Sequence, residues 1–537
     1  MSESSWTETV DVVVIGAGLA GLAAAVAAGH RKWQVALLEK HSKLGGGSSY
    51  SWGFLWVAPN HLAPGVEDSE ADIRSYMEYL SGGQADRARM NAFIQEAPTA
   101  LGFFGERGVG FRLVSGVPDH YYGLAPGAKA KGRMVECELF DARGLGKWQD
   151  SVLAPPAPFR LTGEEMVTWG GMNNSANWPG ELLAARVASD QRGLGVGLVA
   201  HFLAALLRQG VLPRLETQAT CLVTDAGRIV GVETNGGHRI RARRGVVIAT
   251  GGYESNPHLV SVFEGLPRWH SMYPSHITGD GLLLGQEVGA AVRFLRANLA
   301  LFLGYHIPSD PPFFRQAALI EMCSPHTLVV NKAGKRFADE SYFPAVIPAV
   351  LHFDPVEHRF VNLPCYLIFD DHYAQRFVAS VAGGRLPASI SKGASLRELA
   401  GVLSIDMAGL EATVERFNGF VRQGRDADFR RGEVAWTLAK ESRSGPRSLG
   451  VVEKPPFYGV ELQPSAISSA GLAADAEGRV LHVRGDPIPG LYVSGNAAAR
   501  TEYGAGYQAG HSLTSGITFS YLAINNMARD SSISTKN

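Results

Sequence analysis

The stretch EYGAGYQAGHS, residues 502–512, combines residue types that suit the binding of a carbonyl oxygen. Its two tyrosines, Tyr503 and Tyr507, are each followed three residues later by a glycine. A phenol hydroxyl donates a hydrogen bond while it stays neutral at pH 7, because its ordinary pKa is about 10. A backbone N–H left accessible by glycine is a second donor, and such donors stabilise the charge that develops on a reacting oxygen. The spacing alone leaves open whether the stretch is the wall of an active site or a surface loop.

A second group of residues, near the amino terminus, has the spacing of a dinucleotide phosphate site. Gly16, Gly18 and Gly21 form a GxGxxG pattern between a β-branched run and an alanine-rich stretch. The glycines permit a tight turn and a close approach of pyrophosphate, and the start of the following helix attracts its negative charge. A second apolar run ends at Glu39, which is placed to accept hydrogen bonds from an adenosine ribose. Together these features predict a βαβ unit that binds a dinucleotide.

Three later segments favour FAD over a nicotinamide dinucleotide. They are KLGGGSSYSWG after Glu39, GVVIATGGYE at 245–254 and GLYVSGNAAA at 490–499. A chain that returns to one nucleotide from three distant places suits an extended molecule such as FAD. No histidine lies in the serine-glycine stretch, so we expect non-covalent binding. The predicted FAD-binding residues are Gly16, Gly18, Ala20, Gly21, Glu39, Lys40, Gly46, Ser48, Ser49, Ala249, Thr250, Gly251, Asp280, Gly495, Asn496, Ser512 and Leu513.

These residues require an α/β scaffold that brings distant segments to one place. The segment from ATCLVTD to the strand GVVIA has the turns of a β-meander. After residue 290 the chain contains aromatic and proline-rich patches, short strands and amphipathic helices. We therefore predict a Rossmann-type FAD-binding domain with a parallel sheet and a β-meander, plus an inserted α+β catalytic domain. The predicted division is 1–290 for the first part of the FAD-binding domain, 291–455 for the inserted domain and 456–537 for the return segment.

The bulk composition excludes several classes of partner. The chain has 537 residues, a net charge of −1 and no long basic run, so we expect no nucleic-acid partner. Its four cysteines are widely separated and form no CxxC pair, which predicts no metal site and favours reduced thiols in the cytoplasm. The early apolar run is broken by glycines and lacks a basic start, and no other segment is apolar over the roughly 20 residues of a membrane span. We expect no integral membrane segment.

Several segments together resemble the flavoproteins of the fumarate reductase and 3-ketosteroid dehydrogenase superfamily. They include VDVVVIGAGLAGLAAA, GVEDSEADIRSYMEYL, ATGGYESN, TGDGLLLG, LYVSGNAAA and LTSGITFSYLA. SWGFLWVAPN and GVPDHYYGLAPGAKAKGRMVE are similar to 3-ketosteroid Δ1-dehydrogenases in particular. The resemblance covers nearly the whole chain. It implies removal of two hydrogens from carbons beside a ring ketone, a role in steroid metabolism, a hydrophobic ketone as substrate and an external, quinone-like electron acceptor.

The resemblance also implies roles for four residues. Tyr507 and the Gly510 N–H would polarise the ketone, and Tyr342 would take the α-proton as the base. Tyr121 would assist that base, with the adjacent Tyr122 as the alternative. The family's ketone-binding motif is Tyr-Pro-Gly-x-Gly, whereas this chain has YQAG, without the proline and one residue shorter. The altered motif is consistent with a changed substrate.

Three alternatives remain open from the sequence. A smaller cyclic ketone such as cyclohexanone would suit the same chemistry. A fumarate-reductase-like enzyme would instead hydrogenate an unsaturated carboxylate, and Arg500 is present where that activity uses an arginine. A non-catalytic binder on the same scaffold is the third alternative, and it would be colourless when purified.

Overall fold

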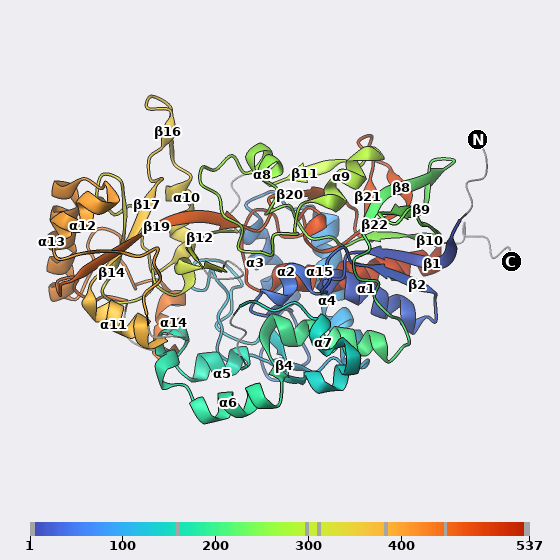
Figure 1. Cartoon of the computed structure of the whole chain (residues 1–537), viewed down its shortest axis with the longest axis horizontal. Helices are drawn as coiled ribbons and strands as arrows, with labels where there is room; N and C mark the ends of the chain where they lie inside the picture. The colour runs from blue at the N-terminus through green and yellow to red at the C-terminus, as the bar shows by residue number, and fades with distance from the viewer. Residues whose placement is uncertain are drawn as a thin grey trace.

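The computed structural model describes residues 6–156, 160–295, 300–308, 313–380, 385–444 and 448–530. Within them, two main sheets lie at opposite ends of an elongated molecule (Figure 1). Seven strands form the sheet on the right of that view, and six form the sheet on the left. The first sheet contains parallel strands and the second is antiparallel, which confirms the predicted mixed α/β class.

The seven-stranded sheet is built around four parallel strands whose carboxyl ends are in register. Ile15 pairs with Leu38 and with Ile248, and Ile248 pairs with Val493. Because each of these residues ends its strand, the loops that follow all begin at one edge of the sheet. The parallel strands are β1 (Glu8–Ile15), β2 (Val35–Leu38), β10 (Arg239–Ile248) and β22 (Pro487–Val493). The antiparallel strands are β8 (Ala219–Asp225), β9 (Arg228–Thr234) and β21 (Arg479–Leu481).

A group of closely packed helices covers one face of this sheet. Every residue of α1 from Leu19 to Ala28 is buried. Many of these residues are alanines, whose small side chains allow α15 and α7 to pack closely against α1. This packing holds the amino-terminal ends of α1 and α15 beside the sheet edge. The helices are α1 (Leu19–His30), α4 (Arg87–Gly105), α7 (Leu194–Leu207) and α15 (His511–Arg529).

The second sheet belongs to the middle of the chain. Its strands are β12 (Leu301–Ile307), β13 (Phe313–Arg315), β14 (Thr327–Asn331), β17 (Cys365–Phe369), β18 (Ser391–Gly393) and β19 (Phe457–Ala466). The helices around it are α10 (Phe343–Val350), α11 (Asp371–Ser380), α12 (Leu396–Leu403), α13 (Met407–Gln423) and α14 (Ala435–Ser444). The division predicted at 455–456 falls just before β19, which pairs with β17 in this sheet. The chain rejoins the first sheet at β21 and β22.

The remaining elements connect these two parts. The helices are α2 (Gly46–Ser49), α3 (Glu70–Ser81), α5 (Gly163–Thr168), α6 (Gly180–Ala188), α8 (Pro257–Phe263) and α9 (Asp280–Glu287). The strands are β3 (Leu55–Trp56), β4 (Phe111–Leu113), β5 (Met134–Cys137), β6 (Phe140–Asp141), β7 (Gln191–Arg192), β11 (Val292–Phe294), β15 (Phe353–Asp354), β16 (Arg359–Phe360) and β20 (Ala470–Leu472). Short 3₁₀ helices span Ala142–Ser151, Met172–Asn177, Ala317–Leu319 and Gly495–Ala497. Within the described ranges, no helix has the length and apolar character that a membrane crossing requires.

Candidate active site

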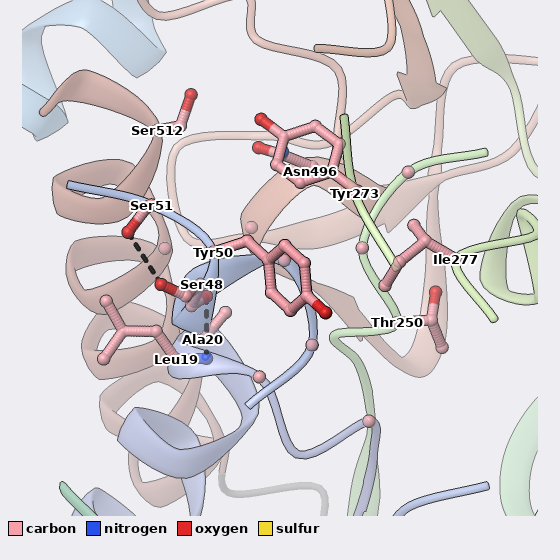
Figure 2. Close-up of a pocket in the computed structure, with 18 of the residues that line it drawn as sticks. Leu19, Ala20, Ser48, Tyr50, Ser51, Thr250, Tyr273, Ile277, Asn496 and Ser512 are labelled. Carbon is pink, nitrogen blue, oxygen red and sulfur yellow. Dashed lines mark hydrogen bonds between the residues drawn. The ribbon is translucent and has the colours of Figure 1, made fainter. Parts of the chain in front are cut away.

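A pocket follows the carboxyl edge of the seven-stranded sheet and reaches the second sheet. It contains about 1540 Å³ of empty space, part of it open to solvent. One wall comes from the loops after β1, β2 and β10, and the other includes Phe302, Gln316 and Tyr507. Figure 2 shows Ser48 and Tyr50 across this pocket from Thr250 and Ile277.

The glycine loop after β1 brings the backbone itself to the pocket surface. Gly16 has φ +97°, and a Cβ there would lie 2.5 Å from the carbonyl oxygen of Ala249. A Cβ on Gly21 would lie 1.8 Å from the carbonyl oxygen of Gly16. These positions therefore exclude side chains and leave room for a phosphate beside the amino-terminal end of α1. The Leu19 N–H at this helix end donates to the Ser48 hydroxyl at 3.2 Å (Figure 2).

The acidic residue after β2 lies farther along the same pocket. Glu39 accepts hydrogen bonds from the backbone N–H groups of Ala17 and His41, each at 2.9 Å. Burial raises the pKa of Glu39 above its ordinary value. Lys40 forms an ion pair with Asp280 at 2.9 Å. Both are among the predicted FAD-binding residues, and both line the pocket.

His276 is a pocket residue that the sequence did not single out. Its ring stacks on His41 with the ring centroids 4.2 Å apart. Burial, aided by the neighbouring His41, lowers the pKa of His276 to about 4, so the imidazole is neutral at pH 7. Its buried Nε2 has no hydrogen-bond partner among the described residues. An unpaired buried polar atom beside a glycine cradle fits a polar cofactor such as FAD.

Most predicted FAD-binding residues line this pocket. Two do not: Gly21 packs within α1, and Ser49 is 2% exposed with its hydroxyl turned toward Gly45. Residues that reasoning from the sequence missed are Tyr50, Gln218, Tyr273, His276 and Ile277. Of these, only Tyr50 carried a signal, since it lies within the serine-glycine stretch. The predicted residues that line the pocket are Gly16, Gly18, Ala20, Glu39, Lys40, Gly46, Ser48, Ala249, Thr250, Gly251, Asp280, Gly495, Asn496, Ser512 and Leu513.

Tyr507 and Gly510 both line the pocket, at its aromatic end. The Tyr507 ring lies 5.0 Å from Phe302 and 5.1 Å from His120, measured between ring centroids. Burial raises the pKa of Tyr507, so its hydroxyl stays protonated at neutral pH. Gly510 has φ +90° and precedes α15, where a Cβ would lie 2.5 Å from the Trp56 backbone nitrogen.

Tyr342 and Tyr121 lie near the Tyr507 loop but are not among the residues that line the pocket. The Tyr342 hydroxyl donates to the carbonyl oxygen of His120 at 3.0 Å, and burial raises its pKa. Burial also raises the pKa of Tyr121 to about 12, while a hydrogen bond with the Tyr507 backbone opposes that rise. The structure thus brings the three tyrosines into one cluster, although their catalytic roles stay predictions.

Among the residues that the structure describes, one group of possible metal ligands lies outside the pocket, at His326, Asp370 and His372. The Asp370 carboxylate is already used by the protein. It accepts hydrogen bonds from the His372 ring at 3.0 Å and from the backbone N–H groups of Glu453 and Lys454. Two histidines without a free carboxylate fall short of the four ligands of a structural zinc site, and we assign no metal here.

The parallel sheet, the glycine cradle and the pocket at the strand ends define a dinucleotide-dependent oxidoreductase of the FAD-binding type. The chain belongs to the FAD binding domain family, whose model matches residues 11–513. Like its 3-oxosteroid 1-dehydrogenase relatives, it is an FAD-dependent oxidoreductase that acts on CH–CH groups.

Two relatives and one solved structure illustrate this membership. The 4-oxocyclohexanecarboxylate 2-dehydrogenase of Sinomonas cyclohexanicum is 36% identical, over 96% of this chain and 92% of the relative. The 3-oxosteroid 1-dehydrogenase of Mycobacterium tuberculosis is 31% identical, over 96% and 97%. The 3-ketosteroid Δ1-dehydrogenase of Sterolibacterium denitrificans, solved with 1,4-androstadiene-3,17-dione, has a TM-score of 0.87 and 26% identity over 97% and 100% of the two chains.

Proposed function

We propose that the protein removes one hydrogen from the α-carbon and one from the neighbouring β-carbon of a cyclic ketone, with a 3-ketosteroid as substrate. The observation that carries this proposal is that Tyr507 and Gly510 line the same pocket as the residues suited to FAD. When bound there without a covalent link, FAD supplies the acceptor for the hydride from the β-carbon. The electrons then pass to an external acceptor of the quinone type.

Tyr507 and Gly510 would bind the ketone oxygen through two hydrogen bonds. As the α-proton leaves, negative charge develops on that oxygen, and each donor stabilises it by about 3–4 kcal/mol. The raised pKa of Tyr507 suits this role because a donor must keep its proton. The surrounding rings exclude water, which strengthens both hydrogen bonds.

Tyr342 would accept the α-proton on its phenol oxygen, with Tyr121 as the neighbouring donor. To do so, the Tyr342 oxygen must leave the carbonyl of His120, to which it donates at 3.0 Å. Burial raises the pKa of Tyr342, so its deprotonated form is scarce at pH 7 and becomes more abundant only as the pH rises. A positioned base of this kind contributes on the order of 10²–10⁴ in rate.

The lining of the pocket favours a neutral substrate. Lys40 already pairs with Asp280, and His276 is neutral at pH 7. A substrate carboxylate would lose its hydration without a free cation among the described lining residues, which is costly. The described aromatic and apolar side chains of the lining suit a flat, neutral ring system instead: Trp52, Phe54, Met272, Phe302 and Ile467.

A monocyclic ketone is the second candidate. It is supported by the 36% identity to the 4-oxocyclohexanecarboxylate 2-dehydrogenase, against 31% for the 3-oxosteroid 1-dehydrogenase. Hydrogenation of an unsaturated carboxylate has less support, because Arg500 is 4% exposed and is not among the residues that line the pocket.

Anaerobic mixing with candidate substrates tests the proposal. Oxidised flavin absorbs at about 450 nm, and transfer of hydride bleaches that band. We expect 4-androstene-3,17-dione to bleach the holoenzyme faster than 4-oxocyclohexanecarboxylate or cyclohexanone. Faster bleaching by a monocyclic ketone would select the second candidate. Bleaching by none of them would reject the proposed function, and a colourless protein that gains no colour with added FAD would indicate a non-catalytic binder.

A further inference from the structure

The residue between Tyr507 and Ala509 marks the place where the chain departs from the motif that it resembles. Gln508 stands there in place of a proline. Its side chain is 1% exposed, and it lines the pocket. A proline would restrict the backbone of this loop by its ring. Gln508 restricts the same loop by hydrogen bonds to two distant parts of the chain.

Both polar atoms of the Gln508 amide are engaged. Its Oε1 accepts hydrogen bonds from the Tyr76 hydroxyl at 2.5 Å and from the His120 backbone N–H at 2.8 Å. Its Nε2 donates to the Ala509 carbonyl oxygen at 3.3 Å. Tyr76 belongs to α3 and is completely buried, so one end of this connection is fixed in the core.

The other end of the connection reaches the remaining tyrosines. His120 precedes Tyr121 in the chain, and its carbonyl oxygen accepts the hydrogen bond from the Tyr342 hydroxyl at 3.0 Å. His120 therefore bonds through its N–H to Gln508, in the loop of Tyr507, and through its carbonyl oxygen to Tyr342.

The segment that carries His120 is itself held in place. Asp119 accepts a hydrogen bond from the Trp56 indole at 2.7 Å and pairs with Arg133 at 2.8 Å. Asp119 and Arg133 are 3% and 2% exposed. A shift of this segment would break buried, charged hydrogen bonds, so the position of His120 is strongly defined.

We infer that Gln508 is a positioning residue that fixes the separation between the ketone-binding pair, Tyr507 and Gly510, and the tyrosines that handle the α-proton. This inference rests on the roles assigned under the proposed function. A misplacement of reacting groups by about 1 Å costs on the order of 10²-fold in rate. The Gln508 amide would therefore affect the rate by setting the distance between the two groups of residues, although it takes no part in the transfer of the α-proton.

The test replaces Gln508 by methionine, which has similar length but makes none of the three hydrogen bonds of the amide. Asn418→Leu is the matched control, because Asn418 of α13 is also a buried amide, and it makes two hydrogen bonds to the backbone of Val452, away from the pocket. Tyr76→Phe is the milder variant, since it removes only one of the bonds to Gln508. FAD content, Tm, kcat, KM and the kinetic isotope effect with α-deuterated ketone are measured for each variant.

We expect Gln508→Met to keep its FAD and to lose kcat on the order of 10²-fold, with a smaller change in KM. The isotope effect should increase, because proton removal becomes slower relative to the other steps. Tyr76→Phe should show the same changes to a lesser degree, and Asn418→Leu should lower Tm without changing kcat or the isotope effect.

Two outcomes separate this inference from the proposed function. If Tyr507→Phe loses kcat while Gln508→Met and Tyr76→Phe keep both kcat and the isotope effect of the wild type, Gln508 is only a packing residue and the inference is overturned. If Tyr507→Phe also keeps full activity, the assigned ketone-binding role fails first.

Discussion

Tyr507 combines a neutral donor with an aromatic, buried surrounding, and this combination is what the enolisation of a ketone requires. Its ring is held by Phe302, Phe343 and His120 at centroid distances of 5.0–5.7 Å. These three rings hold the Tyr507 ring in place and so fix the position of its hydroxyl oxygen. The contribution of Tyr507 to ketone binding then depends on the hydrogen bond that this hydroxyl donates.

Tyr507→Phe removes that O–H bond and leaves the ring packing intact. We expect kcat/KM to fall by about 10²–10³-fold, the effect of one lost donor at a developing oxyanion. The flavin absorbance should be retained. Tyr366→Phe, at a buried tyrosine of β17 in the second sheet, is the control that should change nothing in the kinetics. Full activity of Tyr507→Phe would remove Tyr507 from the ketone site.

The pKa values of the buried tyrosines predict the pH dependence of the reaction. Burial raises the pKa of Tyr121 to about 12 and raises that of Tyr342 as well, so the base form is scarce at pH 7 and increases with pH. The logarithm of kcat/KM should therefore rise from pH 7 to alkaline pH without a plateau, for as long as the holoenzyme stays folded. A plateau already present at neutral pH would contradict a tyrosine base.

At the scale of elements, the strand ends and the helix starts form the cofactor site together. Ile15, Leu38, Ile248 and Val493 end adjacent parallel strands in register. Their loops approach one another so closely that only a residue without a side chain fits at Gly16.

Gly16→Ala tests this close approach. Alanine at φ +97° is strained, and its Cβ would lie 2.5 Å from the Ala249 carbonyl oxygen. Gly65→Ala is the matched control, because Gly65 has φ +84° but no atom within 4 Å of the added Cβ. Strain alone costs roughly 1–2 kcal/mol of unfolding free energy. We expect Gly16→Ala to cost more than Gly65→Ala in denaturant titrations and to weaken FAD binding, which Gly65→Ala should leave unchanged.

At the scale of the whole molecule, a buried ion pair connects the carboxyl-terminal tyrosine loop to helix α4 of the first part of the chain. Arg89 of α4 pairs with Glu502 at 3.1 Å, and both side chains are 1% exposed. Arg89 also donates to the carbonyl oxygen of Asp475 at 2.8 Å. This ion pair fixes the start of the loop that ends at Gly510.

Glu502→Gln should destabilise the fold strongly, because it leaves the Arg89 charge buried without its partner. The expected loss is about 3–5 kcal/mol of unfolding free energy. Asp428→Asn is the control: its pair with Arg416 is exposed, with side-chain exposures of 62% for Arg416 and 31% for Asp428, and such pairs contribute about 0–1 kcal/mol. Chemical denaturation of both variants measures the difference, and equal losses would show that burial does not decide the contribution of the Arg89 pair.

The sequence by itself determined the cofactor half of the site. Gly16, Gly18 and Glu39 belong to one continuous strand–loop–helix–strand unit, in which local spacing and residue type decide the geometry. The placement of Tyr507 and Gly510 at the substrate came from the resemblance of their loop to a family motif, and both residues line the pocket.

Only the tertiary structure decided how distant residues meet. Gln508 and Tyr76 are 432 positions apart, Tyr342 and His120 are 222 apart, and Lys40 and Asp280 are 240 apart. No periodicity or motif encodes such contacts, because they depend on how buried surfaces pack against one another. For the same reason the sequence did not reveal that the Tyr342 hydroxyl donates to the His120 carbonyl oxygen, or that His276 stacks on His41 at the cofactor end of the pocket.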